Sequence, residues 1–160
     1  MFNCLSFIMG HLVGDYLTQT HKQAIGKSVK GNKGRLLCFE HCWNYSMVVA
    51  FFVTFFGKWK LRPDNAIYFD FAVVFTIAFL SHWFIDRYQL ALKWMKLVRQ
   101  TRFEDTVKFD TWKDPWAEEY RIQIKNLRAF FVAIVYVGVD NTMHLVLMWL
   151  ALSYVGRLAL

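Results

Sequence analysis

The sequence contains little proline and little cysteine, and it has no excess of acidic residues. Of its 160 residues two are proline and three are cysteine, and 19 Lys and Arg stand against 12 Asp and Glu. An odd number of cysteines, all in or beside apolar segments, argues against a disulfide framework. No basic residues precede the first apolar stretch, so it does not resemble a secretory signal and predicts a retained helix.

Two of the cysteines, Cys38 and Cys42, lie four residues apart with His41 between them. This arrangement has two interpretations, a thiolate metal site or a pair of small apolar core residues. Buried free cysteine usually behaves as a small hydrophobic residue, so the second interpretation is favoured.

Apolar residues, in contrast, are abundant. Hydrophobic residues make up 56% of the chain and aromatic residues 19%, which exceeds the usual range of soluble proteins and is typical of a membrane protein. The net charge of +7 then indicates basic cytoplasmic loops. Basic and aromatic residues do not alternate regularly, so we expect no nucleic-acid partner. The length fits one domain over residues 1–160.

Four apolar segments predict an all-α integral membrane bundle of about four transmembrane helices. Each segment meets or approaches the ~20 apolar residues that a bilayer requires. Glycines and polar residues interrupt the first segment, as expected for a helix packed inside a bundle. The predicted helices run from about Phe2 to Gln19, Leu36 to Phe56, Ala66 past Asp86 to Met95, and Ala129 to Tyr154.

Basic residues are concentrated in two connections, about residues 20–35 and 96–128. Because an excess of Lys and Arg marks the cytoplasmic side, we expect both connections inside and both termini outside a bacterial inner membrane. Residues 101–120 mix charged and aromatic residues and predict a surface element near the headgroups, interrupted by Pro115. Arg121 to Arg128 predicts a helical lead-in to the last helix.

Ionisable residues lie inside every apolar segment, in three cases as a His and an Asp four positions apart. Residues four apart share one face of a helix. Titratable side chains in hydrocarbon are costly unless they pair, face a cavity or bind a metal. We therefore expect one shared polar site. The pair in the fourth segment lies deeper from the cytoplasmic side than the other three groups, unless that helix is tilted or its spanning part starts later. The seven residues are His11, Asp15, His41, His82, Asp86, Asp140 and His144.

Four imidazoles and three carboxylates form a ligand set that suits Zn, Mn or Fe, as one ion or two. An ion with an open position lowers the pKa of bound water to ~7. We therefore predict a metal-dependent hydrolase that acts on a lipid-linked or phosphorylated substrate at the cytoplasmic side, with Asp86 or Asp15 as the catalytic base. Residues expected around the ligands or the substrate are Gln19, Lys27, Glu40, Asn44, Ser81, Arg87 and Asn141.

Other interpretations of the same residues stay open. They also fit a structural network of ion pairs and hydrogen bonds between helices, or a proton or ion pathway. The protein would then be a carrier, a channel or an assembly factor that binds another membrane protein. An oxidative di-iron site is less favoured because such sites use more histidines and fewer aspartates. The aromatic helix faces also suit self-association into a homo-oligomer.

The motifs resemble an uncharacterised family of small bacterial and phage integral membrane proteins, classed as a domain of unknown function. Its pattern begins with H-x3-D-[FY]-x-x-Q, continues with a Lys-containing loop, a single His and H-[FW]-x-[IL]-D, and ends with D-[QN]-x-x-H. The counterparts here are HLVGDYLTQ with Lys27, then His41, SHWFIDRY and VDNTMHL. The resemblance implies the same seven functional residues, with Asn141 where Gln is more typical, and it implies no established activity. A looser likeness to small inner-membrane metal-dependent hydrolases favours that reaction class.

Overall fold

Helices make up most of the structure, which is a computed structural model that describes residues 4–61, 67–98, 107–109, 122–124 and 127–158. Two of the helical segments, η1 and η2, are π-helical turns that continue the preceding helix. The elements in chain order are α1 (Cys4–Leu12), η1 (Val13–Leu17), α2 (His21–Gly26), α3 (Asn32–Phe51), η2 (Phe52–Phe56), α4 (Ile67–Tyr88), α5 (Leu90–Leu97), β1 (Val107–Phe109), β2 (Ile122–Ile124) and α7 (Leu127–Leu158).

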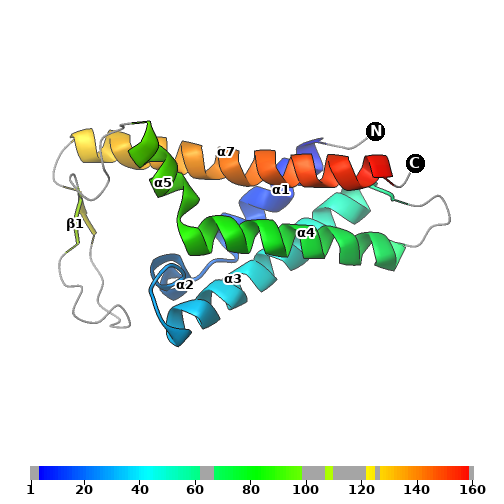
Figure 1. The fold of residues 1–160 in the computed structure, drawn as a ribbon, viewed down its shortest axis with the longest axis horizontal. Helices are drawn as coiled ribbons and strands as arrows, with labels where there is room; N and C mark the ends of the chain where they lie inside the picture. The colour runs from blue at the N-terminus through cyan, green and yellow to red at the C-terminus, as the bar shows by residue number, and fades with distance from the viewer. Residues whose placement is uncertain (1–3, 62–66, 99–106, 110–121, 125–126, 159–160) are drawn as a thin grey trace.

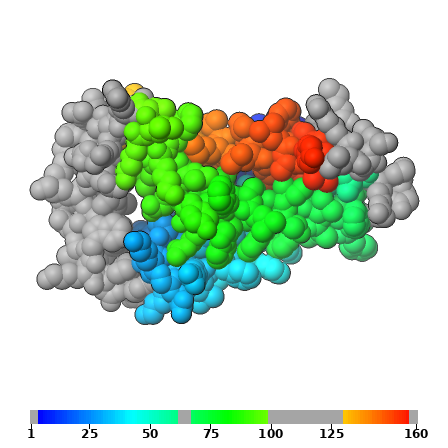
Figure 2. Space-filling view, viewed as in Figure 1, coloured from blue at the N-terminus to red at the C-terminus, as the bar shows by residue number. Residues whose placement is uncertain are grey.

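The long helices α3, α4 and α7 form the bundle (Figure 1). Helix α4 lies between α7 and α3 on the face shown in Figure 2, and α1 packs against α3. The start of α1 and the end of α7 lie at one end of the bundle. The short helices α2 and α5 and the start of α3 lie at the other end.

Three helices are long and apolar enough to cross a membrane: Asn32–Phe56, Ile67–Tyr88 and Phe130–Gly156. The first predicted helix is shorter than the other three within the described residues. Segments α1 and η1 have 9 and 5 residues, a rise of about 21 Å, whereas the hydrocarbon layer is about 30 Å thick. The described residues therefore confirm a helical protein with three candidate spans and do not confirm a fourth.

The first helix lies unusually close to α3 and η2 because two of its residues are glycines. A Cβ atom at Gly10 would lie 2.9 Å from Cβ of Phe52, and one at Gly14 would lie 3.0 Å from Cδ2 of Tyr45. The helix then ends at Thr18, and Thr20 begins α2 through a capping box with Gln23. The glycines thus let a short helix pack inside the bundle.

The third predicted helix is interrupted before Met95. Gln89 takes a left-handed conformation with φ of 50°, which ends α4 at Tyr88 and starts α5 at Leu90 in a new direction. Helix α5 buries Ala91 and Met95 and contacts α7. The prediction of one continuous helix is therefore wrong at this joint, and its predicted start at Ala66 lies outside the described residues.

One short two-stranded sheet accompanies the helices among the described residues. Strands β1 and β2 pair antiparallel, with Val107 opposite Ile124 and Phe109 opposite Ile122. Residues 122–124 are therefore not the predicted helical lead-in, and α7 begins at Leu127. Pro115 and most of residues 101–120 lie outside the described residues.

The outer surface of the bundle is apolar. Inside, Tyr45, Val49 and Val53 of α3 and η2 pack with residues of α4 and α7. Outside, large side chains remain uncovered, and Leu80 and Phe131 are 61% and 65% exposed. Apolar patches of this extent mark a surface that another apolar phase or protein covers, which agrees with membrane association.

We predict that Gly10→Val destabilises the protein by about 1–3 kcal/mol, because the new side chain overlaps Phe52. Gly138→Val is the matched control, since no atom lies within 4 Å of a Cβ atom placed there. Denaturant titration in detergent micelles measures both free energies of unfolding. Equal effects of the two substitutions would contradict the close packing of α1.

Candidate metal centre

Four side chains from three helical segments converge at the centre of the bundle. Nε2 of His41 lies 2.8 Å from Nε2 of His82, 3.2 Å from Oδ1 of Asp15 and 3.3 Å from Oδ2 of Asp86. Nε2 of His82 lies 3.1 Å from that Asp86 oxygen and 3.7 Å from Oδ1 of Asp15. All four residues are buried, and both histidines are 0% exposed. We call these four residues the central cluster.

The separations within the central cluster match those between ligands of one metal ion. Donors about 2.1 Å from a tetrahedral ion lie about 3.4 Å from one another, and neighbouring donors of an octahedral ion lie about 3 Å apart. The measured separations are 2.8–3.7 Å. The lone pairs of two neutral imidazoles repel at 2.8 Å, so a proton or a cation must lie between them. The donors are positioned as a ligand set.

Lys27 supplies positive charge to the cluster from outside the three candidate membrane spans. Its Nζ atom lies 2.7 Å from Oδ2 of Asp86 and 3.5 Å from Nε2 of His41. Burial by itself would lower the pKa of the Lys27 ammonium, but the carboxylates of Asp86 and Asp15 outweigh burial and raise this pKa above its usual value. Lys27 therefore stays charged beside the two aspartates.

Helix α7 adds His144 to the other side of Asp86. Nε2 of His144 lies 3.6 Å from Oδ1 of Asp86, so α7 reaches the depth of the other helices. Nδ1 of His144 donates to the backbone oxygen of Asp140, 2.9 Å away, because a carbonyl only accepts. In the neutral ring Nε2 then carries a lone pair, and it has no hydrogen-bond partner among the described residues. Histidines that bind a metal typically donate one ring N–H to a carbonyl or carboxylate and bind the ion through the other nitrogen.

The carboxylate of Asp140 lies behind His144 rather than in the central cluster. Its Oδ2 atom is 3.8 Å from Nδ1 of His144. The backbone oxygen of Asp140, and not this carboxylate, accepts the hydrogen bond that orients the imidazole. The carboxylate of the predicted ligand Asp140 adds negative charge next to the ring.

His11 does not join the central cluster, although the spacing of four predicts that it shares a face with Asp15. Its Nε2 atom donates to Oδ1 of Asn141 at 2.8 Å, and its Nδ1 atom is bonded to the hydroxyl of Tyr45 at 2.9 Å. The π-helical turn η1 begins at Val13, between the two residues, and its wider turn changes the spacing. Both imidazole nitrogens of His11 are therefore engaged elsewhere.

Arg87 holds the chain segment that carries Lys27. Its guanidinium donates to the backbone oxygens of Lys27 and Val29, at 3.2 and 2.7 Å. The side chain is thus engaged with the backbone next to Lys27 rather than with the ligand atoms of the central cluster. It fixes the connection between α2 and α3 against α4.

The remaining residues predicted around the site do not contact the central cluster. Glu40 and Asn44 are exposed and line a separate surface cavity with Gln23. Ser81 donates to the backbone oxygen of Ala78. Gln19 is half-buried, and its Nε2 atom has no hydrogen-bond partner among the described residues.

Two further residues lie near the cluster: Tyr45, which was not predicted there, and Cys42, for which a thiolate metal site was the less favoured interpretation. Cys42, interpreted as core, forms with His82 and Asp86 a second group whose ligand atoms lie within 4.8 Å of one another. Tyr45 stacks on His82 with ring centroids 3.7 Å apart. Tyr45 lies four residues after His41, so the helical repeat was an available signal for it. Cys42 directly follows His41, and no helical repeat places it near His82 and Asp86.

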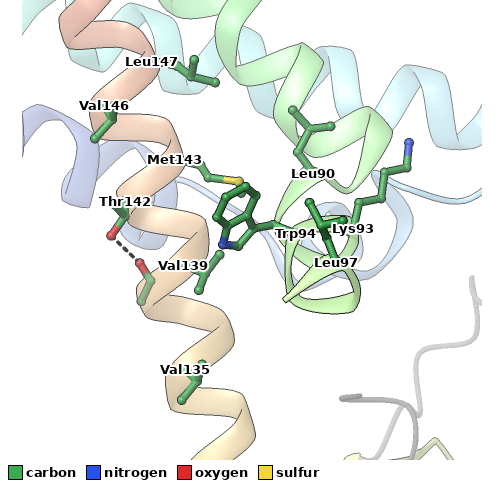
Figure 3. A pocket seen from close by; sticks show the side chains of 11 residues that line it. Leu90, Lys93, Trp94, Leu97, Val135, Val139, Thr142, Met143, Val146 and Leu147 are labelled. Atoms are coloured by element: carbon green, nitrogen blue, oxygen red, sulfur yellow. Dashed lines mark hydrogen bonds between the residues drawn. The ribbon is translucent and has the colours of Figure 1, made fainter. Parts of the chain in front are cut away.

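A large groove lies on the opposite face of α7. It has a volume of about 860 Å³ and lies between α5 and α7, with Trp94 at its centre and Lys93 as its charged residue (Figure 3). Thr142 and Val146 line it, each two residues from His144 and hence about 200° around the helix from it. The groove is therefore part of the apolar outer surface and is not the chamber of the metal centre.

Comparison with known proteins identifies the family of the chain but assigns no activity to it. The chain belongs to the family described as "Protein of unknown function (DUF3307)", whose sequence model matches residues 4–159. No curated protein and no solved structure matches the chain.

We predict that Tyr45→Phe destabilises the protein by about 1–3 kcal/mol, because it leaves a buried nitrogen of His11 without its partner. Tyr88→Phe, at an exposed position, is the control and should have little effect. Denaturant titration in detergent again measures the difference. A Tyr45→Phe protein as stable as the control would show that His11 does not depend on this hydroxyl.

Proposed function

We propose that this DUF3307 protein is an intramembrane metal-binding protein and a metal-dependent hydrolase of a lipid-linked or phosphorylated substrate. One observation supports this proposal above the others. Asp15, His41 and His82 offer ligand atoms within 4.8 Å of one another, and Asp86 lies 3.1–3.3 Å from the two histidines, in an interior where the four residues are 0–6% exposed. Such a group is costly to bury unless a cation compensates its charge.

The ligands of the proposed ion are Asp15, His41, His82 and Asp86, and His144 approaches from the opposite side of Asp86. Imidazole and carboxylate donors suit Zn, Mn or Fe. Four ligands leave two positions of an octahedral ion open, or a fifth position on zinc. A second ion would be bridged by Asp86, whose Oδ1 atom faces His144 while Oδ2 faces the cluster.

The ion would supply an activated water molecule at neutral pH. Of the two predicted catalytic carboxylates, Asp86 is better placed as general base. Its Oδ2 atom faces the other proposed ligands, so that its Oδ1 atom, which faces His144, would remain to accept a proton. The water oxygen bonds to the phosphorus or acyl carbon of the substrate, and its proton passes to Asp86. The same proton then goes to the alcohol oxygen as the ester bond breaks.

The end of the bundle with α2 is the proposed side of substrate entry, and we assign it to the cytoplasm. This end carries the basic connection with Lys22, Lys27 and Lys30 (Figure 1). Both termini would then lie outside the inner membrane. The apolar outer surface supports a substrate with a hydrocarbon part, which would approach within the bilayer.

A second candidate function is ion or proton transport, favoured by a chain of hydrogen bonds that leads to the surface. The exposed Tyr16 accepts from the side-chain nitrogen of Asn141, whose oxygen accepts from His11. His11 is bonded to Tyr45, which stacks on His82. The hydrogen bonds thus run from the exposed Tyr16 to Tyr45, and ring stacking makes the last link to His82; a proton relay would use the hydrogen-bonded part.

We predict that protein purified in detergent without chelator retains about one or two divalent ions per chain, because the central cluster matches a ligand set. His82→Ala should remove the ions, whereas His21→Ala, at an exposed position, should retain them. Elemental analysis of the three proteins measures the content. Wild-type protein with no more metal than His82→Ala would rule out the metal centre.

We further predict that the metal-loaded protein hydrolyses a phosphate ester of a lipid alcohol, and that Asp86→Asn lowers kcat by about a hundredfold or more. Release of inorganic phosphate in mixed micelles measures the rate. Glu40→Gln is the control, since Glu40 is an exposed carboxylate on the surface of α3. Proton flux in proteoliposomes that depends on His11, without ester hydrolysis, would favour transport instead.

A further inference from the structure

We propose that Lys27 competes with the metal ion for Asp86 and that, once displaced, it binds the phosphoryl group of the substrate. The inference rests on the proposed metal centre and assigns a phosphoryl-binding group next to it. It also predicts that a residue outside the ligand set controls the affinity for metal.

The competition follows from shared atoms. Nζ of Lys27 lies 2.7 Å from Oδ2 of Asp86 and 3.5 Å from Nε2 of His41. The same oxygen and the same nitrogen face His82, at 3.1 and 2.8 Å, as members of the proposed ligand set. An ammonium and a divalent ion repel each other strongly at such distances in a protein interior. The ion and the ammonium therefore exclude each other from Asp86.

The charges of the site indicate what the displaced ammonium would bind. Asp15 and Asp86 carry two negative charges, which a divalent ion balances completely. Lys27 then has no carboxylate partner among these ligands and lies beside a neutral centre as a single positive charge. A phosphoryl group provides the missing negative charge and several acceptor oxygens, and lysine ammoniums commonly bind phosphate as point charges.

The position of Lys27 allows such an anion to reach it. Its side chain is 16% exposed, whereas those of Asp86 and Asp15 are 3% and 6% exposed. Among the members of this charged contact, Lys27 therefore lies nearest to the surface, at the end of the bundle with α2 (Figure 1). Substrate would meet the ammonium before it meets the aspartates.

The backbone around Lys27 is fixed, so that its side chain alone has to move. Arg87 donates to the backbone oxygens of Lys27 and Val29, and the backbone N–H of Lys27 donates to the backbone oxygen of Gln23. Gly34 packs directly against this segment, since a Cβ atom there would overlap the backbone oxygen of Val29. The flexible four-carbon stem of lysine suits a charge that moves between two partners.

A purely structural role for Lys27, as the counter-ion of Asp86, predicts something different. Removing such a counter-ion would leave metal affinity unchanged or would lower it through loss of structure. Competition predicts the opposite sign, because the neutral variant removes a cation that the metal must displace. The two roles are therefore distinguishable by one affinity measurement.

The experiment measures Zn²⁺ and Mn²⁺ affinity of the detergent-purified full chain by competition with a chelating dye. We expect Lys27→Met and Lys27→Gln to bind the ion about tenfold tighter than wild type. Lys30→Met, at an exposed lysine of the same connection, should bind like wild type. Two neutral variants are used so that a folding defect of one does not decide the result. Wild type that binds neither ion would refute the metal centre itself, whereas equal or weaker binding by both variants would refute only the competition.

The second measurement is calorimetric titration of the metal-loaded proteins with inorganic phosphate. Wild type should bind phosphate about tenfold tighter than Lys27→Met, and Lys27→Arg should retain most of the affinity because it keeps the charge. Phosphate affinity that is the same in wild type and Lys27→Met would show that the displaced ammonium does not bind the anion.

Discussion

Two carboxylates buried against the same two imidazoles are the constraint on which the rest of this structure depends. Asp15 and Asp86 come from different helices, and both approach His41 and His82 in an interior that is almost closed to water. Removing one partner of such a buried group costs about 3–5 kcal/mol, and leaving the group without a cation costs several more. Lys27 supplies one positive charge, and a divalent ion would balance the cluster fully. The same four side chains therefore affect both the stability of the fold and the binding of the proposed metal ion.

Irregular backbone brings these groups together. The π-helical turn η1 carries Asp15, and glycines in α1 and η1 let that turn approach Tyr45 on α3. The left-handed Gln89 ends α4 directly after Arg87, whose guanidinium holds the segment with Lys27. Interrupted helices at membrane depth are tolerated where they are buried in protein or line a polar site. The short first helix and the joint after α4 are therefore part of how the site is built.

The sequence predicts the long helices and the residue types of the site, because apolar length and the spacing of four are local properties. The pair His82 and Asp86 lies on a regular helix, and its two side chains meet as the spacing predicts. His11 and Asp15 have the same spacing, but the π-helical turn between them sends them to different partners. The ion pair of Lys27 with Asp86 joins residues far apart in the chain, which helical periodicity does not encode. The proximity of Cys42 to His82 and Asp86 depends in the same way on how α3 packs against α4.

X-ray absorption spectroscopy of the bound metal is the decisive measurement, because it reports the donor atoms and their distances. We expect a first shell of nitrogen and oxygen at about 2.0–2.2 Å, with the outer-shell signals of at least two imidazoles. Such a shell corresponds to His41 and His82 with Asp15 and Asp86. A sulfur atom at about 2.3 Å would instead place the ion on Cys42, and an absence of imidazole signals would contradict the proposed centre altogether.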